Sequence, residues 1–111
     1  MNCTVIEYKR CKVVKVTGRV DGSTAPQVEA ALNGIFETGE HHIVLDMTEV
    51  DFMSSAGWWV LIEAQKKCKH LNRGEVVLVN VQEKIRNSLN LVGMDTYFKL
   101  YDDLTKAVGS F

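Results

Sequence analysis

The chain lacks an excess of charge and a long apolar run. Its 13 lysines and arginines nearly balance its 14 aspartates and glutamates, which gives a formal net charge of −1 over 111 residues. Without a positive field to hold a polyanion, the composition argues against a nucleic-acid clamp. The longest uncharged apolar stretch, Ala56 to Ile62, is far below the roughly 18 residues of a membrane-spanning helix, and Met1 to Thr4 begins no signal peptide. These absences predict a cytoplasmic protein that neither binds nucleic acid directly nor inserts into a membrane.

Cysteine and proline are also scarce. The three cysteines are odd in number and include no C-x-x-C pair, so they indicate neither a disulfide framework nor a thiolate zinc site. The remaining candidate ligands are the pair His41-His42 and the segment Cys68-Lys69-His70. Neighbouring residues of a strand point to opposite faces, and residues two apart on a helix do not face each other, so neither spacing closes a metal site. We therefore predict no metal.

The first part of the chain predicts a hairpin and then a helix. Apolar and polar residues alternate from Val5 to Tyr8 and from Lys12 to Val20, and the short break between them indicates a turn. Thr24 and Gln27 have the spacing of a capping box, and Pro26 stands where the first helical turn tolerates a missing N–H. We expect a helix from here to a stop near residue 39.

The rest of the chain alternates between strand and helix patterns. The predicted strands span residues 41–47, 76–81 and 97–101, and the predicted helices span residues 55–71 and 82–92, followed by a last helix capped by Asp102. Such alternation implies a mostly parallel sheet with helices packed against it, and the opening hairpin makes the sheet mixed. We predict one α/β domain over residues 1–111, a sandwich in which about four helices pack against this sheet.

The predicted helix of residues 55–71 has two apolar stripes. One face, which would pack against the sheet, contains Gly57, Val60, Leu61, Ala64, Cys68 and Leu71. The second stripe, at i, i+4, i+7 and i+11, contains Ser55, Trp59, Ile62 and Lys66. An exposed tryptophan and isoleucine beside a serine are typical of a docking surface, because aromatic residues are favoured at interfaces. The alternative is that Trp59 packs beneath a neighbouring loop, and for Trp58, nearer the core face, burial is the favoured interpretation.

Two serines stand at the start of this helix, and three functions compete for them. A hydrolase nucleophile requires G-x-S-x-G, but Met53 stands where the first glycine belongs and no triad is visible, so serine hydrolysis is disfavoured. Ser54 or Ser55 as the helix N-cap would accept a backbone hydrogen bond worth about 0.5–2 kcal/mol. The third function is that of a phospho-acceptor, since a phosphate at a helix N-terminus meets free N–H groups and the positive end of the helix dipole.

Around these serines the sequence resembles the STAS domain of bacterial anti-sigma factor antagonists. That family carries a segment similar to F-M-D-S-S-G-L-G-V, which aligns with Phe52 to Val60. Further segments match in the same order. Thr17 to Asp21 resembles the family's G-x-L-D loop, Ile43 to Asp46 its central strand, and Val77 to Asn80 with Leu91 to Met94 its closing strand and helix end. The resemblance therefore spans the whole chain and implies a STAS-type sandwich.

The resemblance implies a partner switch. In this family the unphosphorylated antagonist binds an anti-sigma factor that is also a serine kinase, frees a sigma factor, and loses this binding once it is phosphorylated. By alignment Ser55 is the phospho-acceptor and Ser54 the less favoured one, while Asp21 lies in the loop beside them. Ser54 replaces the aspartate that the family usually has before the acceptor, which removes an anion next to the hydroxyl. The predicted partner-binding residues are Asp21, Ser54, Trp59, Ile62 and Lys66.

The resemblance also implies a protein that is not an enzyme and has no cofactor. ATP would belong to the partner kinase, because this chain contains no Walker-A sequence or other glycine-rich phosphate cradle. The predicted partners are an anti-sigma factor with serine kinase activity and, as a further candidate, a serine phosphatase. An alternative function is that of a non-phosphorylated STAS scaffold or lipid-transport accessory protein, which would use the same helix surface, and Ser54 in place of the aspartate favours it.

Overall fold

The structure of the protein, a computed structural model, describes residues 1–91, 93 and 96–111. Its elements are β1 (Asn2–Glu7), β2 (Lys12–Val20), α1 (Ala25–Glu37), β3 (His42–Met53), α2 (Ser55–Lys69), the 3-10 turn η1 (His70–Asn72), β4 (Glu75–Val79), α3 (Glu83–Leu91), β5 (Lys99–Tyr101) and α4 (Leu104–Gly109). Val92, predicted to end the third helix, and Met94 of the matched closing segment lie outside the described residues.

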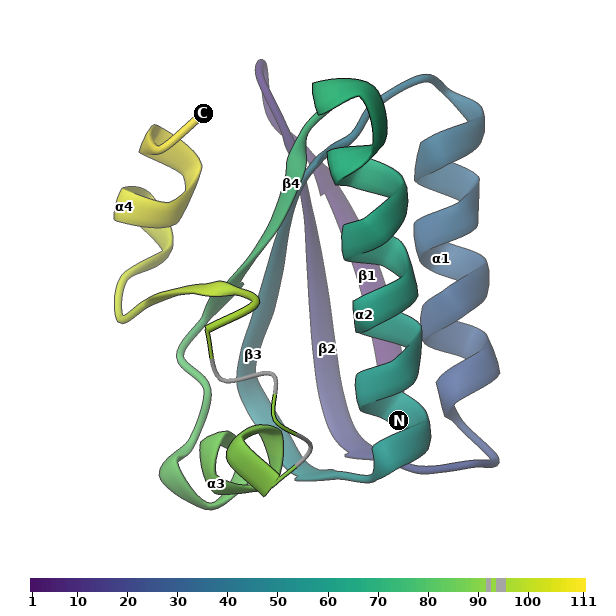
Figure 1. Ribbon diagram of the computed structural model, residues 1–111, viewed down its shortest axis with the longest axis vertical. Coiled ribbons are helices and arrows are strands. Elements are labelled where there is room, and N and C mark those ends of the chain that lie inside the picture. Colours follow the sequence, from purple (N-terminus) through teal and green to yellow (C-terminus); the bar gives the residue numbers. More distant parts are fainter. Residues whose placement is uncertain (92, 94–95) are drawn as a thin grey trace.

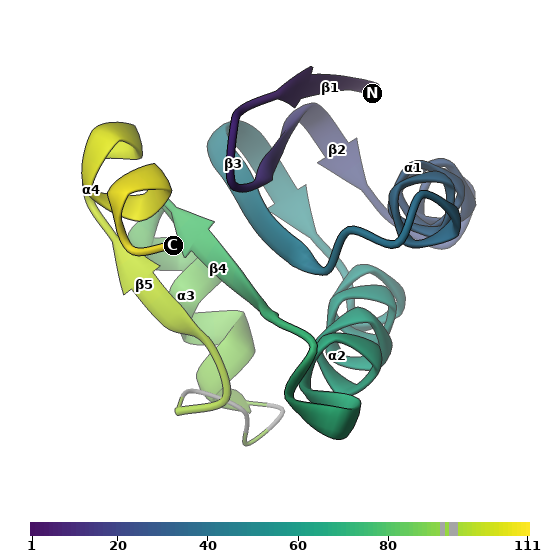
Figure 2. The same ribbon diagram turned by 90° about the horizontal axis from the view of Figure 1, so that it is seen from above.

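The five strands form one sheet in the order β1-β2-β3-β4-β5 (Figures 1 and 2). β1 runs antiparallel to β2, whereas the β2–β3, β3–β4 and β4–β5 pairs are parallel. The opening hairpin is closed by the N–H of Tyr8, which donates to the carbonyl oxygen of Cys11 at 2.9 Å. The predicted α/β class, with a mixed and mostly parallel sheet that begins with a hairpin, is confirmed.

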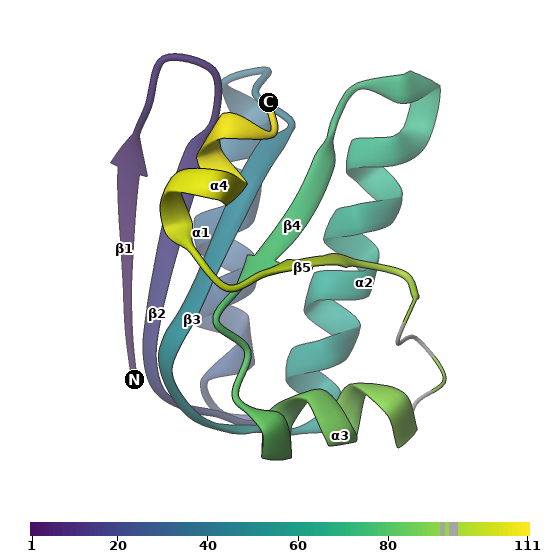
Figure 3. The ribbon, with the colours of Figure 1, turned by 90° about the vertical axis from the view of Figure 1, so that its left-hand side faces the viewer.

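The helices cover the two faces of the sheet unequally. α1 and α2 lie side by side on one face, while α4 lies on the opposite face (Figures 2 and 3). α3 lies at the end of the sheet where α2 begins (Figure 1). Of the helices in the described part of the chain, none is both long enough and apolar enough to cross a membrane.

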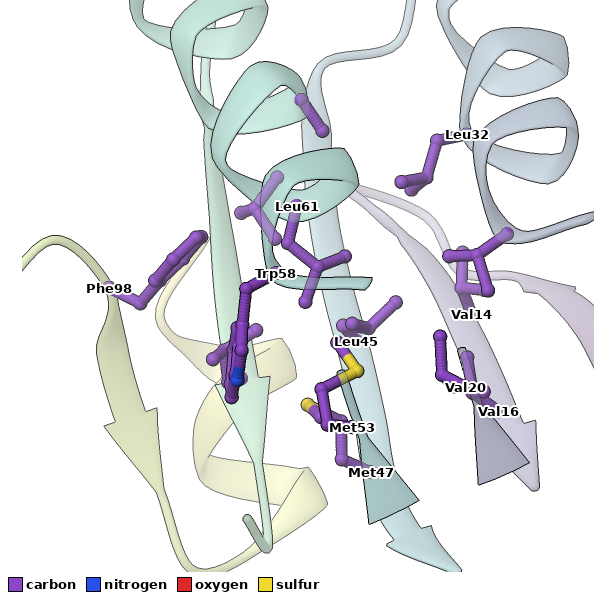
Figure 4. Close-up of a cluster of buried hydrophobic side chains, with 14 of the residues drawn as sticks. Val14, Val16, Val20, Leu32, Leu45, Met47, Met53, Trp58, Leu61 and Phe98 are labelled. Carbon is purple, nitrogen blue, oxygen red and sulfur yellow. The ribbon is translucent and has the colours of Figure 1, made fainter. Parts of the chain in front are cut away.

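Most of the apolar core lies between the sheet and the layer formed by α1 and α2 (Figure 4). Its largest members on these elements include Leu45 of β3, Leu32 of α1, and Trp58 and Leu61 of α2. A smaller cluster on the other face packs strand residues against Ala107 of α4. The start of α2, which carries the two serines, is therefore anchored by a buried tryptophan.

Strand β3 is longer than the sequence predicts. The apolar run predicted a strand over residues 41–47, but β3 continues to Met53 and pairs with the second half of β2. The register between the two strands shifts twice along this stretch. Such irregularities break the alternation of side chains between the two faces, so the buried residues Val50 and Met53 are three positions apart instead of two. The missing alternation explains why this half of the strand was not predicted.

The buried face of α2 also differs from the predicted one. Leu71, predicted to lie on the core face, lies beyond the end of α2 and is 72% exposed. Its φ of 58° is in the left-handed region, which interrupts the helical path and removes Leu71 from the helical pattern. Val60 is only half-buried. The buried residues of α2 are Gly57, Trp58, Leu61, Ile62, Ala64, Gln65 and Cys68.

Two helix starts differ from prediction in their hydrogen bonds. Thr24 is the N-cap of α1, but its side chain accepts no capping bond from the helix. The N-cap of α4 is Asp103 and not Asp102, because Asp103 Oδ1 accepts hydrogen bonds from the N–H groups of Thr105 at 2.7 Å and Lys106 at 3.3 Å.

Candidate functional site

Ser54 connects the start of α2 to the sheet. It is the N-cap of α2, with an extended backbone and with its Oγ 3.4 Å from the N–H of Gly57, which donates to it. Its own N–H donates to the carbonyl oxygen of Val20 at 2.9 Å. Of the two serines that sequence reasoning left open as the cap, Ser54 therefore has this role, and the residue is half-buried.

Ser55 is the first residue of α2, and its side chain is exposed. Within the described part of the chain, its hydroxyl makes no hydrogen bond to another side chain or to the backbone. The first turn of α2 holds no acidic residue, so a negative charge at this position would meet free backbone N–H groups without a like charge in the same turn. Ser55 is thus the more exposed of the two residues, and its hydroxyl is the one not used as a cap.

Gly57 allows α2 to approach the sheet closely. A Cβ atom at this position would lie 2.6 Å from Sδ of Met53 and 2.8 Å from Cγ1 of Val20. Both distances are shorter than van der Waals contact, so a larger residue would displace the helix or its neighbours. The start of α2 is therefore packed closely against the ends of β2 and β3.

Asp21 organises the loop that follows β2. Its Oδ1 accepts hydrogen bonds from the N–H of Ser23 at 2.9 Å, from Oγ of Ser23 at 2.7 Å and from the N–H of Thr24 at 3.2 Å. Its Oδ2 accepts from Nε of Arg19 at 3.0 Å. The bonds from Ser23, with that from Arg19, lower the pKa of the Asp21 carboxyl to about 2. This loop adjoins the serines because Val20, the residue before Asp21, accepts the hydrogen bond from Ser54.

Two residues of the predicted docking stripe are exposed on α2 together with Ser55. Trp59 is 54% exposed, which is high for a side chain of its size. Lys66 is exposed and its Nζ lies 3.2 Å from Oε1 of Glu63, one turn away on the helix surface. The alternative in which Trp59 packs beneath a loop is inconsistent with this exposure.

Ile62 does not belong to this exposed stripe, and its prediction as a surface residue was wrong. It is 1% exposed. It follows Trp58 by four residues and precedes Gln65 by three, so it lies on their flank of the helix. Gln65 faces β4 and the segment before β5, because its Nε2 donates to the carbonyl oxygens of Val76 and Tyr97, each at 3.1 Å, and its Oε1 accepts from the N–H of Val76 at 2.7 Å. The buried surface of α2 is therefore wider than a single apolar stripe.

Trp58 anchors the start of α2 to α3. It is buried, as the favoured interpretation predicted, and its ring centroid lies 6.4 Å from that of Phe98 (Figure 4). Its Nε1 donates to Oγ of Ser88 at 2.8 Å, and Ser88 in turn donates to the carbonyl oxygen of Ile85 at 2.7 Å. The indole N–H is thus satisfied inside the protein, and the two neighbouring tryptophans have opposite environments.

Arg19 and Phe52 belong to this end of the sheet and were missed by sequence reasoning. The carbon of the Arg19 guanidinium lies 3.8 Å from the centroid of the Phe52 ring, and Phe52 is 38% exposed. The two residues are register partners of β2 and β3. Their contact could be foreseen only by extending the third strand to Met53, which its broken alternation concealed.

The three histidines lie far from the serines. His42 begins β3 whereas Ser54 follows its end, and His70 follows α2 whereas Ser55 begins it. The 15 residues of α2 correspond to roughly 22 Å at 1.5 Å per residue. His41 precedes His42 at the same end of the sheet. The structure therefore brings no imidazole to either hydroxyl, and a serine–histidine pair is not formed.

Comparisons with known proteins agree with this arrangement. The STAS domain profile matches residues 2–107. BtrV of Bordetella bronchiseptica, provisionally named an anti-sigma factor antagonist, is 27% identical over 111 residues, which are 100% of this chain and 95% of BtrV. The anti-sigma-F factor antagonist RsfB of Mycobacterium tuberculosis is 26% identical over 106 residues, which are 95% of this chain and 84% of RsfB.

A solved structure gives the same result. The crystal structure of an anti-sigma factor antagonist from Mycobacterium paratuberculosis is similar with a TM-score of 0.87 and 27% identity, and the match covers 98% of this chain and 92% of that one. The profile match thus covers nearly the whole sequence, including the five strands, α2 and the serine segment at its start. The chain belongs to the STAS domain family, and its relatives include proteins named as anti-sigma factor antagonists.

Proposed function

We propose that this protein is an anti-sigma factor antagonist switched by phosphorylation of Ser55. In its unphosphorylated form it binds an anti-sigma factor that is also a serine kinase, and this binding releases a sigma factor. The observation that carries the proposal is the contrast between the two serines. Ser55 is exposed at the start of α2 on the same helix as the exposed Trp59, whereas the Ser54 hydroxyl caps the helix.

The physical effect of a phosphate supports a switch that acts on the interface. Phosphorylation adds roughly −1.5 to −2 charge at neutral pH. At the first residue of a helix this charge is favourable for the fold, because it meets unpaired N–H groups and the positive end of the helix dipole. The same charge would have to be desolvated in any interface that covers Ser55. Ser55 also follows Ser54, which is hydrogen-bonded to the residue before the anionic Asp21. We therefore expect phosphorylation to end partner binding without unfolding the protein.

The catalytic step belongs to the partner. The chain offers no glycine-rich phosphate cradle and no imidazole beside its serines, so ATP would be bound by the kinase and this protein would be its substrate. We propose that the protein is not an enzyme and needs no cofactor. A serine phosphatase would restore the binding form. Since a sigma factor acts on the transcription machinery, the proposed location is the cytoplasm.

The test is phosphorylation by purified partners. Each anti-sigma factor kinase that the source genome encodes is incubated with this protein and ATP, and the modified residue is identified by mass spectrometry. We expect phosphate on Ser55, its loss in Ser55→Ala, and its retention in Ser54→Ala as the matched control. Phosphate on neither serine would refute the switch. Partner binding that is indifferent to Ser55→Asp would instead favour the non-phosphorylated scaffold function.

A further inference from the structure

The side chain of Arg19 is fixed in place on the surface by two neighbours. Its Nε donates to Oδ2 of Asp21 at 3.0 Å, and its guanidinium carbon lies 3.8 Å from the centroid of the Phe52 ring. The side chain is nevertheless 62% exposed. Arginine stacked on an aromatic ring loses little further conformational freedom when it binds a partner. The guanidinium is therefore both accessible and preorganised.

The contacts of Arg19 leave most of its donors unused. A guanidinium carries five N–H donors in one plane, and the bond to Asp21 uses the one at Nε. Among the described residues, none accepts a hydrogen bond from the terminal amino groups of Arg19. Two parallel N–H groups of such a fork match the two oxygens of a carboxylate. Because Asp21 already holds the Nε edge, the terminal amino groups are the donors left for a ligand.

Arg19 lies at the end of the sheet that carries the proposed switch. Val20, the next residue, accepts the hydrogen bond from the N–H of Ser54, and Phe52, the residue under the guanidinium, is only two positions before Ser54. Two exposed aromatic side chains belong to the segments on either side of Ser54. Phe52 lies near the end of β3, and Trp59 lies near the start of α2. Aromatic residues and arginine are the types most often found to dominate binding energy at interfaces.

We propose that Arg19 is a partner-selecting residue that binds a carboxylate of the anti-sigma factor in a bidentate manner. This inference rests on the proposed function and adds the chemistry of the partner, which must present an aspartate or glutamate to the end of β2. Asp21 has a positioning role in this arrangement, because it orients the guanidinium and does not face the partner carboxylate itself. A phosphate at Ser55 would add negative charge at the end of the molecule where the partner's carboxylate binds, and the two negative charges would repel each other.

The test compares three variants that differ in charge and geometry. Arg19→Gln removes the charge, Arg19→Lys keeps the charge but lacks the planar fork, and Arg10→Gln is the matched control. Arg10 is an exposed arginine in the turn before β2, at the opposite end of that strand. Binding of each unphosphorylated variant to the purified anti-sigma factors of the source genome is measured by calorimetry.

We expect Arg19→Gln to raise the dissociation constant about tenfold or more, Arg19→Lys to stay within about threefold of Arg19→Gln, and Arg10→Gln to bind like the wild type. The exposed ion pair contributes little to the fold, so the melting temperature of Arg19→Gln should stay within about 5 °C of the wild type. Unchanged amide NMR signals of Ser23 and Thr24 would verify that the Asp21 loop is intact.

The failures of the two proposals are distinguishable. If the wild type binds an anti-sigma factor and Arg19→Gln binds equally well, or Arg19→Lys restores full affinity, the bidentate role of Arg19 is refuted and the proposed function stands. If the wild type binds none of the anti-sigma factors, the proposed function is refuted, and the role of Arg19 with it.

Discussion

Replacing Ser55 with aspartate separates the stability of the fold from partner binding. An aspartate at this position would add the first negative charge to the first turn of α2. Such a charge near a helix N-terminus stabilises by about 0.3–1 kcal/mol. With an unfolding entropy of about 2.1 cal/mol/K per residue, a chain of 111 residues has roughly 230 cal/mol/K in total, so this gain raises the melting temperature by about 1–4 °C. We therefore expect Ser55→Asp to be as stable as the wild type or slightly more stable, while it no longer binds the anti-sigma factor.

The assay combines a thermal melt followed by circular dichroism with a calorimetric titration of the anti-sigma factor. Ser54→Asp is the matched control, because aspartate caps a helix as well as serine does and carries the same charge one residue earlier. We expect this variant to melt near the wild type and to keep binding, since the resemblance places an aspartate at position 54 in the family. The reasoning fails if Ser55→Asp lowers the melting temperature by more than about 5 °C, or if it binds like the wild type. Loss of binding in both variants would mean that any charge at this end, and not one at Ser55, blocks the interface.

Two further substitutions test the surface and the interior of α2. Trp59→Ala removes an exposed side chain, so we expect the unfolding free energy to change by no more than about 0.5 kcal/mol. Binding to the anti-sigma factor should weaken about tenfold or more. Leu71→Ala, just beyond the other end of α2, is the exposed control and should change neither the stability nor the affinity. Unchanged affinity of Trp59→Ala would place the docking surface elsewhere. Gln65→Leu leaves the N–H and the carbonyl oxygen of Val76 without their side-chain partner. An unsatisfied buried polar group costs about 1–3 kcal/mol of stability, so urea unfolding should show that the unfolding free energy falls by at least about 2 kcal/mol. A loss near zero would contradict the structural role of Gln65.

The sequence alone predicts the order of strands and helices along the chain. It also predicts that the serines stand at a helix start, because both features depend on local patterns. Apolar periods of two and of about 3.6 residues recur along the chain, and a serine at a helix start is a capping signal that needs no knowledge of distant residues. The choice between Ser54 and Ser55 as the cap required coordinates, since both fit the pattern. It depends on where β3 ends, and that end is set by pairing with β2.

The burial of Ile62 and Gln65 on α2 could not be predicted, because it depends on a gap elsewhere in the sheet. The pairing of β4 with β5 begins only at Val77 and Lys99, so Val76 has no strand partner on that side. Gln65 supplies the missing hydrogen bonds from the helix. Glutamine is mostly found on the solvent face of a helix, so nothing in the sequence marks Gln65 as buried. Ile62, which shares its flank, was predicted on the surface because its spacing from Ser55 and Trp59 places the three on one helical stripe. The polar residue is buried because it replaces a neighbouring strand.

The close fit of Gly57 against Val20 and Met53 has a consequence for the kind of signal that the protein can carry. Because the backbone at Gly57 already lies this close to both side chains, the first turn of α2 has little room to move inward when a phosphate is added to Ser55. The two states of the proposed switch would then share one backbone and differ in surface charge alone. No conformational relaxation would separate the modification from the loss of binding, so the kinase and the phosphatase would set the response time. The amount of released sigma factor would follow the number of unphosphorylated copies of this protein.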